Sequence, residues 1–256
     1  MNAAESRKAF VNNLKYLDEV FARFNDRKYV IGIDQSLSNT AVSVYNLDKV
    51  PKKDRIKVYS VSDYIKESTR KNRTVYQRLH LMRERLLQLI KSHPSCFVVV
   101  EGYAYSTKQN RELAGEVGGT VRWILWDNSK FAGPSLLVSP LSLKKYILGA
   151  YRKSGPLTKE RIIMMVYKKY GIEVKNNDEA DAIVLSKIGR DFVKFVKKYA
   201  EEVQKMTDVD ARKFMLNGWN NKDCKLKKYQ WEVVVSLMVK RGDVKIMDFY
   251  DDESHS

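Results

Sequence analysis

Tyr29-Val30-Ile31-Gly32-Ile33-Asp34 is the stretch that decides the fold class, because it has the pattern of a short buried strand that ends in a carboxylate. Residues 40–45 then alternate with the two-residue period of a half-buried strand, and residues 56–61 are a candidate third strand. The turn-prone Pro51-Lys52-Lys53-Asp54 separates the second strand from the third. Three consecutive strands with short connections predict an antiparallel meander.

Helical and strand patterns alternate in the rest of the chain to about residue 200. Apolar spacing predicts a helix at 75–90, a strand at 96–100 that ends at Glu101, a helix at 111–126, a strand at 136–139, and helices at 142–148, 158–170 and 177–193. We therefore expect an α/β fold. Its mixed five-stranded sheet would begin as the meander, continue through strand–helix crossovers with parallel strands, and be flanked by helices.

Two extensions are expected beside a main domain of residues 28–200. The N-terminal extension, residues 1–27, carries one apolar stripe at helical spacing, formed by Phe10, Leu14, Leu17, Phe21 and Phe24. The C-terminal extension, residues 201–256, is less regular. Its residues 232–250 fit either a hairpin or a helix followed by a tail, and its last residues are acidic.

The charge of the chain is its clearest compositional feature. Lys and Arg number 47 and Asp and Glu 31, which gives a formal net charge of +16. A polyanion such as nucleic acid is the expected partner, because each cation placed on a phosphate releases a condensed counterion. The alternative is a basic surface that only keeps the protein in solution.

Other features exclude several classes of protein. The apolar runs are far shorter than the ~20 residues that span a bilayer, and the N-terminus lacks the apolar region of a secretory signal. The 2 cysteines, Cys96 and Cys224, are not in a C-x-x-C pair, which argues against a disulfide framework or a structural zinc site. We expect a cytoplasmic protein.

Four carboxylates stand at positions where distant parts of the chain can meet. Asp34 ends the first strand, Glu101 ends the fourth, and Asp178 and Asp181 share one face of a helix. Such a group can hold Mg²⁺, and two such ions ~4 Å apart can cleave a phosphodiester. Taken singly, Asp34 could cap a turn, Asp178 could cap its helix, and Asp181 could be solvated. A purely structural role explains Glu101 less well, because it ends an apolar run, where an ionised side chain would be buried at high cost unless it is paired or binds a metal.

The predicted helix at 111–126 has a face of small residues. Ala114, Gly115, Gly118 and Gly119 would allow another backbone to approach closely. Glycine in a helix costs roughly 1 kcal/mol, so the face suggests a packing role, either within the chain or between two copies of it.

Three motifs resemble those of a known family. Val30-Ile31-Gly32-Ile33-Asp34-Gln35-Ser36-Leu37, Val98-Val99-Val100-Glu101-Gly102 and Asn177-Asp178-Glu179-Ala180-Asp181 are similar to the active-site motifs of RuvC-type Holliday-junction resolvases, members of the RNase H-like nuclease superfamily. The resemblance covers roughly residues 28–195. It includes lysines near Gly149 and Gly155, where the family carries lysines close to its catalytic centre.

The resemblance implies an RNase H-like fold, a homodimer and roles for individual residues. Asp34, Glu101, Asp178 and Asp181 would hold two Mg²⁺ ions, for which Mn²⁺ would substitute. Lys144 and Lys145 would bind DNA phosphates, and Lys159 would stabilise the transition state. The alternative for each lysine is an ordinary surface charge.

The chain also departs from the bacterial family. Where the family places a junction-wedging aromatic residue, this chain has Ala104 between Tyr103 and Tyr105. Either tyrosine is a candidate DNA contact, as is Lys108. These departures and both extensions are more similar to a phage-encoded resolvase, which would act in the cytoplasm of a bacterial cell or phage-infected host.

The resulting hypothesis is a Mg²⁺-dependent endonuclease that resolves four-way and other branched DNA by paired symmetric nicks. Alternatives are an RNase H-like nuclease on hybrids or flaps and a non-catalytic junction-binding module. An actin-like kinase is a fourth class, but the chain is too short for its two lobes and shows no glycine-rich adenosine loop.

Overall fold

The structure, a computed structural model, describes residues 28–36, 39–48, 55–61, 63, 74–102, 111–128, 135–149, 159–220 and 226–239, together with residues 5, 8 and 10–12. Its centre is a five-stranded sheet in the order β3-β2-β1-β4-β5. The strands are β1 Tyr29–Asp34, β2 Ala41–Asn46, β3 Ile56–Ser60, β4 Cys96–Glu101 and β5 Ser135–Val138. The β1–β2 and β2–β3 pairs are antiparallel, whereas β1–β4 and β4–β5 are parallel. The predicted mixed sheet is confirmed.

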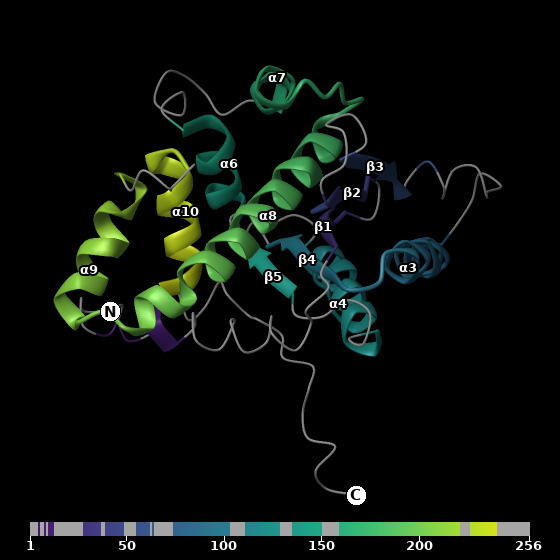
Figure 1. The fold of residues 1–256 in the computed structure, drawn as a ribbon. Coiled ribbons are helices and arrows are strands. Elements are labelled where there is room, and N and C mark those ends of the chain that lie inside the picture. The colour runs from purple at the N-terminus through teal and green to yellow at the C-terminus, as the bar shows by residue number, and fades with distance from the viewer. Residues whose placement is uncertain are drawn as a thin grey trace, which may run out of the picture.

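Helices cover both faces of this sheet (Figure 1). They are α3 Val75–Ser92, α4 Arg111–Asp127, α6 Pro140–Leu148, α7 Lys159–Tyr170, α8 Asn177–Gln204, α9 Asp208–Asn217, the short 3₁₀ helix η3 Gly218–Asn220, and α10 Lys228–Val239. The long helix α8 crosses one face, with α6, α7 and α10 packed beside it, while α3 and α4 cover the other face. No helix in the described part of the chain is long and apolar enough to cross a membrane.

Alternate side chains of each central strand pack on opposite faces of the sheet, so the sheet has a hydrophobic core on each face. In β1, Val30 packs on the α8 side, whereas Ile31 and Ile33 pack on the α3/α4 side. In β4, Phe97 and Val99 face α8, and the alternate residues face α3 and α4. Because successive side chains point to opposite faces, the last residues of the two strands, Asp34 and Glu101, belong to the α8 face.

The helix α8 continues to Gln204, beyond the expected end near residue 193. The reason is an aromatic cluster in which the rings of Phe195, Tyr199 and Phe214 surround the fully buried Trp231, with centroids 5.1, 6.0 and 5.2 Å from the Trp231 ring. The C-terminal segment therefore contributes to the core beside α8. Of the two forms open to residues 232–239, the structure has the helix, α10.

The predicted N-terminal helix is described only at residues 5, 8 and 10–12, which are helical. Phe10 is fully buried, and its ring lies 6.2 Å from that of Phe195. The rest of residues 1–27 and the tail after Val239 lie outside the described residues.

Close backbone packing holds α8 on the sheet. A Cβ atom on Gly32 would lie 2.3 Å from the Ala182 carbonyl oxygen and 2.6 Å from the Ser186 amide nitrogen. The hydroxyl oxygens of Ser186 and Ser43, on β2, are 3.0 Å apart. Only glycine permits so close an approach, and the approach fixes the position of α8 over β1.

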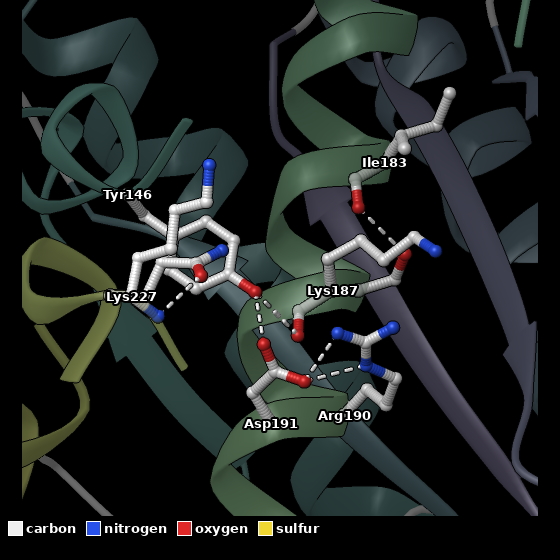
Figure 2. Close-up of polar contacts among 8 residues, drawn as sticks. Tyr146, Ile183, Lys187, Arg190, Asp191 and Lys227 are labelled. Carbon is white, nitrogen blue, oxygen red and sulfur yellow. Dashed lines mark hydrogen bonds and ion pairs between the residues drawn. The ribbon is translucent and has the colours of Figure 1, made fainter. Parts of the chain in front are cut away.

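A buried polar network joins α6 to α8 (Figure 2). The Tyr146 hydroxyl donates to Asp191 Oδ2. The Arg190 guanidinium contacts Asp191 Oδ1 through Nε at 2.6 Å and Nη2 at 2.5 Å. The Lys187 ammonium stands over the rings of Tyr45 and Tyr170, 4.7 and 4.4 Å from their centroids. Each oxygen of the buried Asp191 carboxylate therefore has a donor, and α6 is held at a fixed place along α8.

Tyr146→Phe is expected to lower the free energy of unfolding by about 1–3 kcal/mol, because Asp191 Oδ2 would stay buried without its donor. Chemical denaturation measures this change, and Tyr167→Phe, which alters an exposed tyrosine, is the control. If Tyr146→Phe unfolded at the same denaturant concentration as this control, Arg190 alone would satisfy the Asp191 carboxylate.

Candidate metal centre

Two neighbouring parallel strands bring Asp34 and Glu101 together. The β1–β4 register pairs Ile33 with Val100, so the next residue of each strand lies side by side on the face that α8 covers. After β1 the chain turns sharply, since the amide of Ser36 donates to the Thr40 hydroxyl oxygen at 3.2 Å and the Asn39 amide donates to the Ser36 hydroxyl oxygen at 2.8 Å. In the described part of this turn, the side chains of Ser36 and Thr40 make these contacts, and that of Asp34 does not.

The first turns of α8 supply the other two acids. The N-cap is Asn176, whose side-chain oxygen accepts from the Glu179 amide at 2.9 Å, and the Glu179 carboxylate accepts from the Lys175 amide at 2.8 Å. Capping is therefore the role of Asn176, not of Asp178. This arrangement directs Asp181 toward the ends of β1 and β4.

Asp34, Glu101 and Asp181 form one compact carboxylate cluster. One oxygen from each lies within 4.8 Å of the other two. Asp34 is 7% exposed and Asp181 6% exposed, while Glu101 is half-buried. Asp178 is outside this group of three, yet its charge is close enough to raise the pKa of each member.

Burial and mutual repulsion make the cluster hard to ionise. Burial, then Glu101, Asp181 and Asp178, raises the pKa of Asp34 well above its ordinary value. Burial, followed by the Glu101 charge, raises the pKa of Asp181 to about 7. Burial also raises the pKa of Glu101, opposed by a hydrogen bond from Asp34 and by the Lys144 charge. Burial and like charge therefore favour the protonated forms of Asp34 and Asp181 when no cation is bound.

These residues fit a divalent cation. All the atoms available as metal ligands are carboxylate oxygens, which Mg²⁺ prefers. Their crowding creates an excess of negative charge that a cation would neutralise. In addition, Asp181 Oδ1 is buried without a hydrogen-bond donor in the described part of the chain. A buried carboxylate oxygen without a donor is costly, and a cation at this place would remove the cost.

The lysines proposed from the sequence lie in different surroundings. Lys144, on α6, is close enough to the cluster that its charge lowers the pKa values of Glu101 and Asp181. Lys145 instead pairs with Glu232 of α10 at 2.7 Å. Lys159 is the first residue of α7, and its side chain is outside the described part of the structure. Tyr103, Tyr105 and Lys108 lie outside the described residues altogether.

Two carboxamide side chains next to the acids were not predicted as site residues from the sequence. Gln35 Nε2 donates to the Glu101 carbonyl oxygen at 2.8 Å, and Asn177 Nδ2 donates to Asp181 Oδ2 at 2.9 Å. The available signal was position alone: Gln35 follows Asp34 in the chain, and Asn177 stands four residues before Asp181, on the same helical face.

Without metal, the stability of the fold is expected to fall as the pH rises from about 4 to about 7. Between the ordinary pKa of 3.8 and the folded pKa of about 7, the folded protein holds a proton on Asp181 that the unfolded chain releases. Stability falls with pH wherever the folded state binds more protons. Thermal unfolding in EDTA measures the profile, and Asp181→Asn should flatten it. A wild-type profile that rises across this window would contradict the shift.

Several solved structures are similar to this chain. Thermus thermophilus RuvC in complex with a Holliday junction substrate is 23% identical, with 62% of this chain and 90% of that chain covered and a TM-score of 0.46. A second Thermus thermophilus RuvC structure is 16% identical, with 66% and 95% covered and a TM-score of 0.46. The yeast mitochondrial Holliday junction resolvase is 15% identical, with 75% and 95% covered and a TM-score of 0.43. Neither protein-family models nor curated protein sequences gave a match.

Proposed function

We propose that this protein is a Mg²⁺-dependent endonuclease that cuts four-way DNA junctions and related branched DNA. The observation that carries the proposal is the approach of carboxylate oxygens from Asp34, Glu101 and Asp181 to within 4.8 Å. The net charge of +16 favours a polyanionic substrate. The motifs around these three acids, and their resemblance to the resolvase motifs, narrow that substrate to branched DNA.

The acids and the lysines have different roles in the proposed phosphodiester hydrolysis. Asp34, Glu101 and Asp181, with Asp178 beside them, would hold two Mg²⁺ ions, which when bound activate the attacking water and stabilise the attacking and leaving oxygens. Lys144 holds the scissile phosphate beside the acids, and Lys159 stabilises the charge that develops in the transition state. The products carry 5′-phosphate and 3′-hydroxyl ends, which a ligase can join.

A second copy of this chain is the proposed partner, since a two-fold symmetric junction requires two active sites related by the same symmetry. Helix α4 is the candidate interface. Beta carbons added to Gly115 and Gly119 would meet nothing within 4 Å, and Trp123 and Trp126 on the same helix are 64% and 48% exposed. Small residues for close approach and two exposed tryptophans fit a helix-to-helix contact between copies.

Light scattering tests the dimer. We expect a dimeric mass at micromolar concentration, and Gly119→Arg together with Trp123→Glu should give monomers that nick junctions without pairing the cuts. A monomeric wild-type protein with full paired cleavage would refute the dimer.

Cleavage of a panel of synthetic DNA substrates tests the activity. The panel holds a four-way junction, a flap, an RNA–DNA hybrid and a linear duplex, each with Mg²⁺ and with EDTA. We expect paired symmetric nicks in the junction that require Mg²⁺. Cleavage restricted to the hybrid would indicate an RNase H-like nuclease, and junction binding without cleavage would indicate a non-catalytic module. Either result would overturn the proposal.

A further inference from the structure

In the described part of the chain, three buried carboxyl and carboxamide oxygens have no hydrogen-bond donor, one on an acid of the carboxylate cluster and two on residues that hydrogen-bond to acids of the cluster. They are Asp181 Oδ1, Asn177 Oδ1 and Gln35 Oε1. In the described part of the chain, these are the only buried side-chain atoms that can act solely as acceptors and have no partner. Each such atom carries a desolvation penalty of about 1–3 kcal/mol. Their occurrence together points to one missing source of positive charge or of hydrogen-bond donors.

The orientation of both carboxamides follows from what their nitrogens contact. Gln35 Nε2 faces a carbonyl oxygen of Glu101, and Asn177 Nδ2 faces the carboxylate of Asp181. Turning either group over would place two acceptor oxygens against each other, which is repulsive. The carboxamide oxygens must therefore be the atoms that lack a partner.

The Asn177 oxygen lies within reach of a cation at the cluster. The nitrogen and oxygen of one carboxamide are about 2.3 Å apart by standard amide geometry. Because Asn177 Nδ2 is 2.9 Å from Asp181 Oδ2, Asn177 Oδ1 lies no more than about 5 Å from that carboxylate oxygen. An ion ligated at ~2.1 Å, with a water in its shell, spans that separation.

We propose that Gln35 and Asn177 belong to the metal site, where their carboxamide oxygens accept hydrogen bonds from the hydration shell of the divalent cation held by Asp34, Glu101 and Asp181. Mg²⁺ dehydrates reluctantly and keeps several waters in proteins, so such waters need acceptors on the protein. Each side chain would thus act at both ends: the nitrogen holds the main chain of Glu101 or the carboxylate of Asp181, and the oxygen positions waters of the ion. This inference rests on the metal site of the proposed function.

Paired substitutions separate the two roles. Asn177→Leu and Gln35→Met remove both the donor and the acceptor, whereas Asn177→Asp and Gln35→Glu remove the donor but keep an acceptor oxygen. If the oxygens serve the metal, the acidic variants retain Mn²⁺ affinity and the apolar variants lose it about tenfold or more. If only the nitrogens matter, the acidic variants lose affinity as the apolar ones do, offset only by the attraction of their added negative charge for the cation. The apolar variants are therefore the decisive comparison.

The measurement is Mn²⁺ binding at about pH 8, followed by the spin-resonance signal of free Mn²⁺, with thermal unfolding in EDTA as the check on folding. Asn128→Leu is the matched control, since Asn128 is a buried carboxamide whose Nδ2 donates to the Ile124 carbonyl oxygen at 2.9 Å, at the end of α4. It should bind Mn²⁺ like wild type. A wild type that binds no Mn²⁺ would overturn the proposed nuclease itself. Wild-type affinity in both folded apolar variants, or acidic variants no better than apolar ones, would overturn this inference alone.

Discussion

Asp181→Asn is expected to reduce Mg²⁺-dependent junction cleavage by about a thousandfold or more while leaving junction binding intact. Asp181 contributes one of the three clustered oxygens, and a neutral amide in its place both weakens cation binding and puts an N–H group against the ion. Loss of a metal ion removes several kcal/mol of transition-state stabilisation, and each 1.36 kcal/mol is about tenfold in rate. Single-turnover cleavage and gel-shift binding in Ca²⁺ measure the two properties separately.

The same substitution has an opposite effect on stability. Because burial and neighbouring charges disfavour the ionised Asp181, Asp181→Asn should unfold at a higher temperature than wild type in EDTA at about pH 8. Mg²⁺ should then stabilise wild type more than the variant. Asp48→Asn, at an exposed acid, is the control for both measurements. Cleavage near the wild-type rate would remove Asp181 from the site.

Gly32→Ala is expected to give the largest loss of stability, roughly 3 kcal/mol or more, which is at the upper end for an overpacked core. The added methyl group would lie 2.3 Å from the Ala182 carbonyl oxygen, and a helix backbone cannot yield as a flexible side chain can. Relief requires α8 to move away from β1. Since Asp34 is two residues after Gly32 and Asp181 is next to Ala182, that movement also opens the carboxylate cluster, so Mn²⁺ affinity should fall as well.

Chemical denaturation and Mn²⁺ titration test this prediction. Gly115→Ala is the matched control, because its added methyl group meets nothing within 4 Å and alanine is the better helix former by roughly 1 kcal/mol. It should equal or exceed the stability of wild type. A Gly32→Ala protein within about 1 kcal/mol of wild type would show that α8 tolerates displacement from the sheet.

The local patterns of the sequence predicted the sheet and the residues at which its strands end. The buried runs before Asp34 and Glu101 predicted two strands that end in carboxylates, and both are confirmed as β1 and β4. The period of two residues in a strand is a property of the backbone itself. It therefore also places Asp34 on the face of Val30 and Glu101 on the face of Phe97 without knowledge of the rest of the fold.

Some features were predicted incompletely because they depend on distant segments. Helix α8 was expected to end near residue 193, but its second half is stabilised by Trp231, which the pattern around residues 194–204 does not reveal. Likewise, the sequence made Asp178 and Asp181 equal candidates for metal ligands. The structure distinguishes them, because Asp181 belongs to the compact cluster and Asp178 lies outside it.

The sequence by itself determined which residues carry charge, where the strands end and on which strand face each acid stands, because these follow from covalent alternation along the backbone. Only the tertiary structure decided that α8 covers that face, with Asp181 turned toward Asp34 and Glu101. The reason is that the rotation of α8 about its axis is set by backbone contact at Gly32, between segments about 150 residues apart in the chain. The free energy of that contact depends on both segments together, so the orientation of α8 cannot be predicted from the pattern of either segment alone.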